Sequence, residues 1–321
     1  MVNNSNPLFY SGTNLDRATE LRKNPAWLKQ QKHHPKKSVV PVWKMLHLVS
    51  QTSEPGIRAI RFYEHRAQQL HHQGNMSILL GLENDLPVFV VDVSEQEQSP
   101  IDSPDTQWLD LRQCGPLLSQ QDAGLLAYAR AMVHWHASHQ FCGYCGAPTK
   151  SAQGGHIRSC QNRDCARDGF PRTDPAVIMR IEHQLEGSDQ ASILLGRQSR
   201  WPEGAYSVLA GFVDPGESLE QAVAREVFEE AGVRITDIIY QGSQPWPFPS
   251  SLMLGFKARA VDSKLNFSSH ELQHAAWFSA KQVLSFGEWG DSGSGLRLPR
   301  RDSISRRLID DWLYEVGLYQ E

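Results

Sequence analysis

GFVDPGESLEQAVAREVFEEAGV, residues 211–233, predicts the end of a strand, a turn that contains proline and glycine, and one short helix. Ser218 is a good helix N-cap, and Gln221, three residues later, completes a capping box. Gly232 is well placed as the left-handed residue that ends the helix. The apolar side chains recur at helical spacing and form one packing stripe: Leu219, Ala222, Val223 and Val227.

Three carboxylates share another face of the same predicted helix. Glu226, Glu229 and Glu230 are three and four residues apart, so their side chains are neighbours and repel each other. An ordinary solvated helix would carry lysine four residues after each glutamate, but those positions hold Glu230, Val233 and Arg234. A hard divalent cation, Mg²⁺ or Mn²⁺, explains the cluster better, because such an ion takes oxygen ligands and leaves room for phosphate and water.

The segment matches the pattern G-x5-E-x7-R-E-U-x-E-E-x-G-U, where U is apolar, at every fixed position, and it therefore resembles the Nudix family. The resemblance implies an α/β/α sandwich with metal on this helix. It also implies hydrolysis of a nucleoside diphosphate that is linked to another group. Within the box, we expect Arg225 to point away from the glutamates and to pair with Glu217, which would pin the turn to the helix.

The chain has five cysteines, and four of them form two close pairs. The pairs are Cys142-x2-Cys145 and Cys160-x4-Cys165, with 14 residues between them. In a reducing compartment this spacing indicates a metal site rather than two disulfides. Four thiolates close a tetrahedron around Zn²⁺ and leave no position for a catalytic water, so we expect one structural zinc per chain. Cys114 stands alone and is expected to be a small buried hydrophobic residue.

A second motif, SQPWPFPSS at residues 243–251, follows the box after a short predicted strand at 235–240. Its three prolines stiffen the loop, and Trp246 and Phe248 offer flat faces on which a base can stack. By itself, such a loop is more often a packing corner than a ligand site. Together with the box and the four cysteines, it resembles the SQPWPFPxS signature of the NADH pyrophosphatase and NAD-capped RNA hydrolase subfamily of Nudix enzymes.

The subfamily resemblance implies roles for particular residues of this chain. The catalytic metal would be held by the backbone carbonyl of Ala210 and by four side chains: Glu226, Glu229, Glu230 and Glu271. The three box glutamates would form the catalytic centre, with Glu230 orienting or deprotonating the attacking water. Glu271 begins an E-x5-W-F pattern, and its alternative is a plain exposed acid at the start of a strand. Substrate contacts are implied for Phe170, Phe212, Gln244, Pro245, Trp246, Pro247, Phe248, Pro249, Ser250, Ser251 and Ser305.

The implied reaction is hydrolysis of the pyrophosphate bond of NADH or NAD⁺ to nicotinamide mononucleotide and AMP. The same site would also remove the NAD cap from RNA 5′ ends and leave monophosphorylated RNA, and both activities can coexist. A third hypothesis is a non-catalytic Nudix-fold module that binds nucleic acid. Such a module would be expected to lose box glutamates, and this chain keeps all of them. Members of the subfamily are homodimers whose active sites draw on both subunits, so we expect a homodimer.

The expected organisation is an N-terminal α+β domain at 1–135, a zinc ribbon at 136–170, a Nudix sandwich at 171–300 and a packed C-terminal helix at 301–321. In the N-terminal part we expect strands at 39–48 and at 76–93, the latter around a turn at Asn84-Asp85, and a helix at 120–139. In the Nudix part we expect strands at 175–182, 191–197 and 206–212, a turn at 186–189, and a mobile Gly/Ser-rich insertion at 287–295.

The 321 residues carry a net charge of −4 and are 40% hydrophobic, which is ordinary for a globular chain and excludes a disordered or collagen-like one. The apolar runs are far shorter than the roughly 20 residues that cross a bilayer, and the start of the chain does not resemble a leader. We therefore expect a cytoplasmic protein without membrane contact. The segment between Glu20 and Glu54 is basic, and a solvated, partly mobile segment is favoured there over a phosphate-binding arm. Its basic residues are Arg22, Lys23, Lys29, Lys32, Lys36, Lys37 and Lys44.

Overall fold

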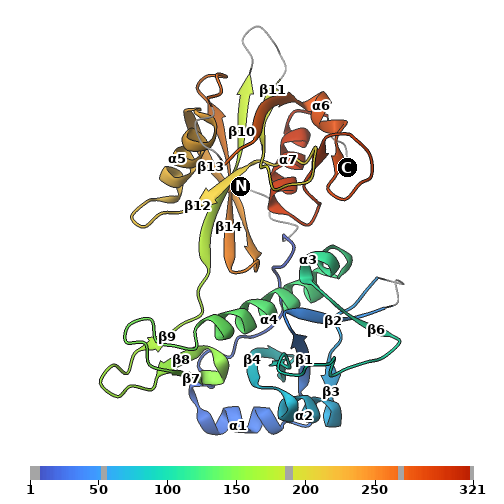
Figure 1. Ribbon diagram of the computed structural model, residues 1–321, viewed down its shortest axis with the longest axis vertical. Coiled ribbons are helices and arrows are strands. Elements are labelled where there is room, and N and C mark those ends of the chain that lie inside the picture. Colours follow the sequence, from blue (N-terminus) through green and yellow to red (C-terminus); the bar gives the residue numbers. More distant parts are fainter. Residues whose placement is uncertain (1–7, 52–55, 185–190, 267–270, 319–321) are drawn as a thin grey trace. The chain divides into compact units, whose positions relative to one another are not determined.

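The computed structural model describes residues 8–51, 56–184, 191–266 and 271–318. The chain divides into two compact units (Figure 1). Unit 1 comprises residues 1–8, 174–245 and 251–321, and unit 2 comprises residues 9–173 and 246–250. Within the described ranges, no helix combines the length and the apolar character that a membrane span requires. The expected turn at 186–189 lies outside the described residues.

Unit 1 is built on a mixed six-stranded sheet. Its strands follow the order β13-β14-β10-β11-β15, and β12 also pairs with β10. β10 and β14 run parallel, whereas β11 and β12 pair with β10 in the antiparallel sense. The strands are β10 (Asp174–Gln184), β11 (Ala191–Arg197), β12 (Leu209–Phe212), β13 (Ile235–Trp246), β14 (Ser251–Ala260) and β15 (His274–Ser279).

Alternate residues of β10 fill two separate cores, one on each face of this sheet. Val177 and Met179 pack in the core that the apolar stripe of α5 (Leu219–Ala231) completes. Ile178 packs in the other core, together with Trp312 of α7 (Ile304–Glu315). Figure 1 shows α5 and α7 on opposite sides of the sheet. The structure therefore confirms the expected α/β/α sandwich and the helix near the end of the chain.

The helix of the box follows the sequence prediction closely. Ser218 caps α5, and both hydrogen bonds of the capping box with Gln221 are present. Gly232 ends the helix with a φ of 70°, a left-handed conformation that favours glycine.

Three neighbouring elements differ from expectation. β13 continues to Trp246, beyond the predicted end at residue 240, and β12 begins only at Leu209. Part of the expected mobile insertion forms β16 (Gly287–Glu288), which pairs in parallel with β17 (Arg297–Leu298). A short helix, α6 (Ala280–Leu284), comes before it.

Unit 2 contains a second six-stranded sheet of order β4-β5-β1-β2-β6, with β3 also paired to β1. The pairing of β1 with β5 is parallel. Its strands are β1 (Ser38–Trp43), β2 (Leu46–Ser50), β3 (Phe62–Tyr63), β4 (Met76–Glu83), β5 (Leu86–Asp92) and β6 (Thr106–Leu109). Its helices are η1 (Leu21–Lys23), α1 (Pro25–His33), α2 (Glu64–Gln73), α3 (Leu111–Cys114), η2 (Gly115–Leu117) and α4 (Gln120–Ser138).

The predicted strands and helix of unit 2 are found except at one turn. The turn at Asn84-Asp85 is confirmed, with both residues at positive φ, and α4 matches the expected helix. The expected single strand at 39–48 is instead a hairpin, because Lys44 and Met45 also adopt positive φ and reverse the chain. Cys114 is completely buried in the core beside α4, as expected.

The basic segment is ordered into α1 and β1, and one of its lysines departs from the prediction. Lys37 is only 2% exposed, and its ammonium group donates hydrogen bonds to the Lys32 carbonyl and to Gln68. Burial lowers the pKa of Lys37. The expectation of a solvated segment is therefore wrong at this position, whereas Lys29 and Lys36 are exposed.

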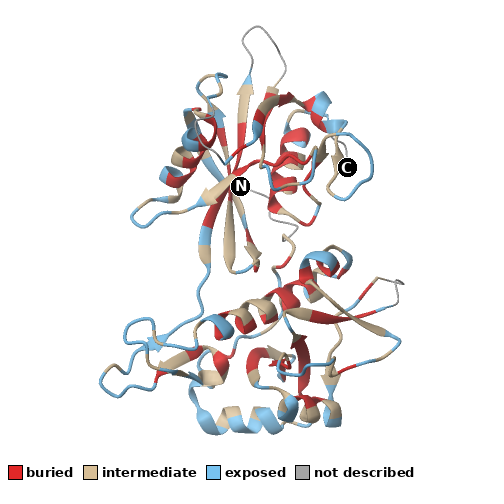
Figure 2. Cartoon of the chain, viewed as in Figure 1, coloured by how far each residue is buried: buried red, intermediate tan, exposed pale blue. Residues whose placement is uncertain are grey.

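A small three-stranded sheet follows α4 in the expected zinc ribbon. It comprises β7 (Thr149–Ala152), β8 (Ile157–Cys160) and β9 (Asp168–Gly169), and the short helix η3 (Gln153–Gly155) joins the first two. Figure 2 shows buried residues concentrated in the two large sheets and their helices, whereas the loops of this small sheet are mostly exposed.

Candidate functional site

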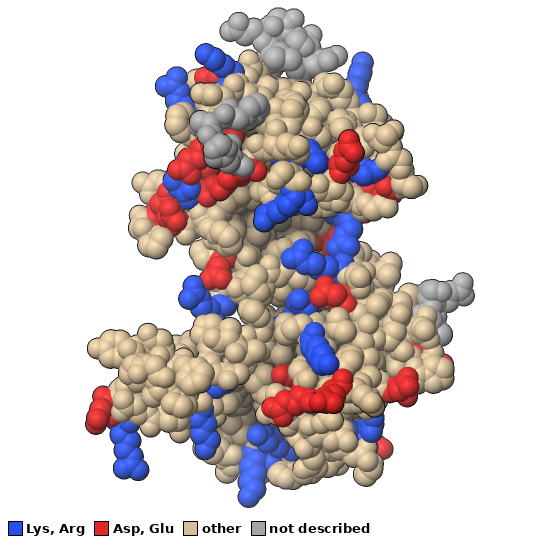
Figure 3. Space-filling model, in the orientation of Figure 1, with Lys and Arg blue, Asp and Glu red and all other residues tan. Residues whose placement is uncertain are grey.

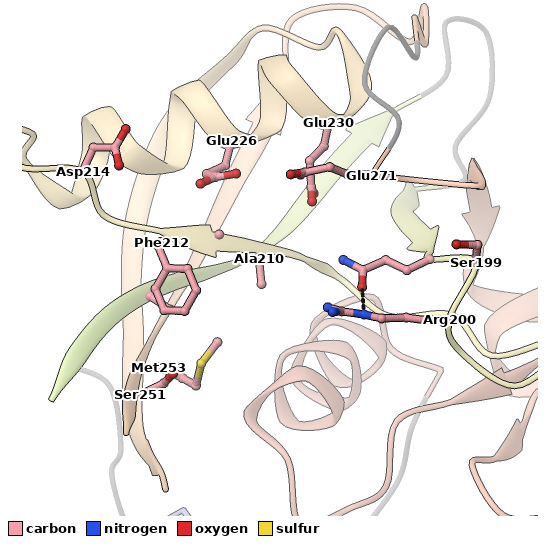
Figure 4. Close-up of a pocket in the computed structure, with 13 residues that line it drawn as sticks. Ser199, Arg200, Ala210, Phe212, Asp214, Glu226, Glu230, Ser251, Met253 and Glu271 are labelled. Atoms are coloured by element: carbon pink, nitrogen blue, oxygen red, sulfur yellow. Dashed lines mark hydrogen bonds between the residues drawn. The ribbon is translucent and has the colours of Figure 1, made fainter. Parts of the chain in front are cut away.

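A cavity of about 540 Å³ opens on unit 1 beside α5 and β12 (Figure 4). Six of its lining residues were predicted from the sequence: Ala210, Phe212, Glu226, Glu230, Ser251 and Glu271. Seven others were not: Ala176, Gln198, Ser199, Arg200, Gly211, Asp214 and Met253. In the space-filling view, acidic side chains gather over the region of α5 (Figure 3).

The first wall of the cavity is acidic. Glu226 and Glu230 lie one turn apart on α5, and they are only 8% and 2% exposed. Figure 4 shows their carboxylates beside that of Glu271, which lies three residues before β15. The strand β12 passes directly below them. There, Gly211 approaches the carboxyl group of Glu226 so closely that a side chain at position 211 would displace it.

The Glu230 carboxylate is poorly compensated within the described chain. Burial, together with the nearby charges of Glu226 and Glu271, raises the pKa of Glu230 to about 8. One carboxylate oxygen of Glu230 is buried and has no hydrogen-bond partner in the part of the chain that the structure describes. Burial also raises the pKa of Glu226. An orphaned, desolvated oxygen among hard oxygen donors fits a divalent cation, which would supply the missing positive charge.

The third box glutamate is placed differently. The Glu229 side chain is 56% exposed and does not line the cavity. Its carboxylate accepts a hydrogen bond from Arg225, which also contacts Glu226 at 3.0 Å and Glu217 at 2.7 Å. The predicted pair of Arg225 with Glu217 is confirmed, but the expectation that Arg225 points away from the other glutamates is wrong. Arg225 lowers the pKa of Glu217 by hydrogen bonding.

The opposite wall carries a cation that the sequence reasoning missed. Arg200 is the single basic residue among the described residues that line the cavity, and Figure 4 shows it across from the carboxylates. Its guanidinium donates a 2.8 Å hydrogen bond to Gln198. The available signal was its position in the loop between the predicted strands at 191–197 and 206–212, just before the box. Phe212 lies at the mouth of the cavity with 60% of its surface exposed.

Two of the predicted substrate residues are buried inside unit 1. Gln244 has no exposed surface, and its amide donates to the carbonyl of Asp302 and accepts from the N–H of Ile304, both at 2.7 Å. Ser305 is 5% exposed, and its hydroxyl lies 2.7 Å from that of Ser207. Both side chains use their hydrogen-bonding groups to hold α7 against neighbouring segments of unit 1, so the structure does not support the substrate contacts predicted for them.

The aromatic residues of the proline-rich loop pack within unit 2. Trp246 and Phe248 both make edge contacts with Tyr10, with ring centroids 5.7 and 5.8 Å apart. The carbonyl of Pro247 accepts a hydrogen bond from Arg130, whose guanidinium also lies 5.3 Å above the Phe248 ring. These contacts favour the packing-corner reading. Pro245, which belongs to unit 1, is absent from the lining of the cavity. The substrate contacts predicted for Trp246, Pro247, Phe248, Pro249 and Ser250 stay predictions.

The four paired cysteines meet in unit 2. All four sulfur atoms lie within 4.8 Å of one another. Backbone N–H groups of Cys145 and Tyr144 lower the pKa of Cys142, which favours the thiolate that a metal requires. Four converging sulfurs with no open position fit a structural zinc ion. Phe170, just beyond them, is 63% exposed, and its predicted contact with substrate stays a prediction.

In a comparison with known proteins, three family models match the chain: one in its N-terminal part, one over the four cysteines and one over the segment that holds the box. A model of the NADH pyrophosphatase-like rudimentary NUDIX domain matches residues 36–135, and one of the NADH pyrophosphatase zinc ribbon domain matches residues 137–170. A model of the NUDIX domain matches residues 177–297.

Two curated relatives illustrate the similarity. The NAD-capped RNA hydrolase NudC of Mycobacterium bovis is 43% identical over 220 residues, which cover 66% of this chain and 68% of that protein. The NAD-capped RNA hydrolase NUDT12 of Homo sapiens is 41% identical over 202 residues, which cover 61% of this chain but only 43% of that protein. Among solved structures, the NUDIX domain of Shewanella oneidensis NrtR complexed with ADP ribose matches 46% of this chain and 91% of its own, at 19% identity and a TM-score of 0.37.

Proposed function

Since this chain belongs to the Nudix family, we propose that it hydrolyses the pyrophosphate bond of NADH or NAD⁺ to give nicotinamide mononucleotide and AMP. One observation carries the proposal: the buried Glu230 carboxylate, with an unpartnered oxygen, lies beside Glu226 and Glu271 in an open cavity. Burying these carboxylates together costs free energy unless a cation binds between them, and a cation bound there can contact the diphosphate of a substrate.

The proposed roles follow from this wall. The carboxylates of Glu226, Glu230 and Glu271 and the carbonyl of Ala210 would hold the catalytic cations. Bound divalent cations neutralise diphosphate charge and lower the pKa of water. Glu230 would orient the attacking water and accept its proton, because its carboxylate lines the cavity beside the other ligands. The role of Glu229 as a metal ligand stays a prediction, because its carboxylate is hydrogen-bonded to Arg225.

The other wall would hold the substrate. The Arg200 guanidinium would bind a phosphate oxygen, because charge-assisted hydrogen bonds to phosphate suit its planar group. Phe212 would stack on one ring of the dinucleotide, since its exposed face borders the same cavity. Ser251 lies in the same lining.

A second candidate activity is removal of the NAD cap from RNA. Both curated relatives carry that activity in their names, and the pyrophosphate that would be cleaved is the same. Comparing the hydrolysis of NADH and of NAD-capped RNA at equal concentration ranks the two substrates.

Incubation of the purified protein with NADH and Mn²⁺ or Mg²⁺, followed by chromatography, tests the proposed reaction. We expect nicotinamide mononucleotide and AMP in equal amounts. Glu230→Gln should lower turnover by orders of magnitude, whereas Glu220→Gln, at an exposed position on the same helix, should leave it unchanged. An active and folded Glu230→Gln protein would refute the assignment.

We also propose Mg²⁺ or Mn²⁺ as the catalytic ion, a homodimer as the assembly, and the cytoplasm as the location. The four-thiolate site supports the location, because cytosolic conditions keep such cysteines reduced.

The family descriptions support the proposed division into an N-terminal domain, a zinc ribbon and a Nudix domain. Light scattering on the purified chain tests the dimer, and activity with each ion in turn tests the metal.

A further inference from the structure

A second cavity lies in unit 2, between the end of α4 and the zinc ribbon. Its volume is about 170 Å³, and it is lined by the Trp135 ring of α4 and by the rings of Phe141 and Tyr144 from the loop that follows. Trp135 is buried, whereas Phe141 and Tyr144 are 65% and 70% exposed. Large aromatic side chains that remain this exposed around a hollow are typical of a surface that binds something.

A cation lies among these rings. The guanidinium of Arg167 lies 3.7 Å from the centre of the Tyr144 ring, and it makes no hydrogen bond or ion pair with other described residues. Its hydrogen-bonding edge is therefore available to a ligand. Arg158 also lines the cavity, but it is held in place by hydrogen bonds to Thr149 and His136.

The surrounding segment is cationic although the whole chain is acidic. Residues 141–173 carry five basic and two acidic side chains, against a net charge of −4 for the chain. The segment remains positive even when a zinc ion with four thiolates, of net charge about −2, is included. Exposed aromatic rings combined with surplus positive charge are the features with which proteins hold unpaired nucleic acid strands.

We propose that this cavity binds one unpaired base of a single-stranded RNA, with nearby basic side chains following its phosphates. The proposal rests on the capped-RNA form of the proposed function and adds a site for the RNA body to it. Pockets for drug-sized ligands measure about 300–1,000 Å³. A cavity of 170 Å³ therefore suits a single ring system rather than a whole dinucleotide.

The test compares a capped RNA of about ten nucleotides with free NADH. We expect Tyr144→Ala and Arg167→Gln each to raise KM for the capped RNA roughly tenfold, as loss of one stacked base does. Turnover of NADH should stay within about twofold. Tyr144→Phe, which keeps the ring, should restore RNA affinity, and Tyr63→Ala, at an exposed tyrosine elsewhere in unit 2, should change neither substrate.

Zinc content and circular dichroism establish that the variants fold. The proposal is overturned if capped RNA and NADH are affected equally, if neither is affected, or if Tyr144→Ala converts an oligomer to a monomer, since the cavity would then be an interface between copies. Fluorescence anisotropy with an uncapped single-stranded RNA tests the site without catalysis. A protein that binds this RNA through Tyr144 but hydrolyses no NADH would refute the proposed function and leave this proposal standing.

Discussion

A methyl group placed on Gly211 would lie 1.8 Å from the carboxyl carbon of Glu226. The strand and the helix of the site are thus in contact at a position where any side chain would displace the Glu226 carboxyl group. Gly211→Ala should displace the Glu226 carboxyl group from the site and lower kcat about 100-fold, as loss of one stabilising group in the transition state does. Gly295→Ala is a suitable control, because a methyl group there meets no atom within 4 Å. Unchanged Mn²⁺ affinity of Gly211→Ala in a calorimetric titration would contradict this reading.

The buried Glu230 carboxyl should destabilise the protein when no Mg²⁺ or Mn²⁺ is present. Its folded pKa of about 8 exceeds the ordinary value of 4.5, so the folded state binds more protons than the unfolded state between these pH values. Stability therefore falls as the pH rises through this window. Glu230→Gln removes the effect and should raise the free energy of unfolding at pH 8.5 by about 1–3 kcal/mol. Urea denaturation of the zinc-loaded protein without added Mg²⁺ or Mn²⁺ measures it, and no gain over wild type would count against the burial argument.

Arg200 should contribute to substrate binding rather than to the fold. Its guanidinium lines the cavity and has Gln198 as its hydrogen-bond partner. Arg200→Ala should raise KM for NADH about tenfold or more, since hydrogen bonds to charged groups contribute about 1.5–3 kcal/mol. Arg200→Lys should recover part of this loss. Arg234→Ala, at an exposed arginine of the same unit, is the control. An unchanged KM in steady-state assays would remove Arg200 from the site.

Local patterns in the sequence predicted local structure well. The caps at Ser218 and Gly232 depend only on neighbouring residues, and both are found as expected. Burial of Gln244 depends on contacts with residues about 60 positions later, which no local pattern reveals. Arg200 was missed for a related reason. A single arginine in a loop carries no motif, and the fold alone brings it opposite the carboxylates.

Zinc should be required for the structure of the ribbon and not for the chemistry of the other unit. Four sulfur atoms within 4.8 Å of one another can close a complete coordination shell. Cys165→Ser should abolish the single bound zinc, as measured by atomic absorption, and lower the melting temperature. Cys114→Ala, at the buried cysteine outside the cluster, should retain zinc. A zinc-free Cys165→Ser protein with unaltered thermal stability would show that the ion is dispensable for folding.

Buried neutral histidines should make unit 2 sensitive to acid. Burial lowers the pKa of His47 to about 3, and it lowers those of His71, His136 and His156 to about 4. The ordinary value is 6.5, so below that pH the unfolded state binds more protons than the folded state. Stability should therefore be complete above pH 6.5 and fall as the pH drops toward 4, by about 1.4 kcal/mol per unit of pKa difference at each site.

His47 isolates one contribution to this acid sensitivity. It is fully buried, and neither ring nitrogen has a hydrogen-bond partner among the described residues. His47→Leu therefore removes a proton-binding group without breaking a hydrogen bond, and it should make unfolding less steeply dependent on pH between 6.5 and 4. His65→Gln, at an exposed histidine of the same unit, is the matched control variant. Urea denaturation at pH 7, 6 and 5 measures the slope. Equal slopes for His47→Leu and wild type would mean that His47 gains no proton on unfolding and that the acid sensitivity comes from the other histidines.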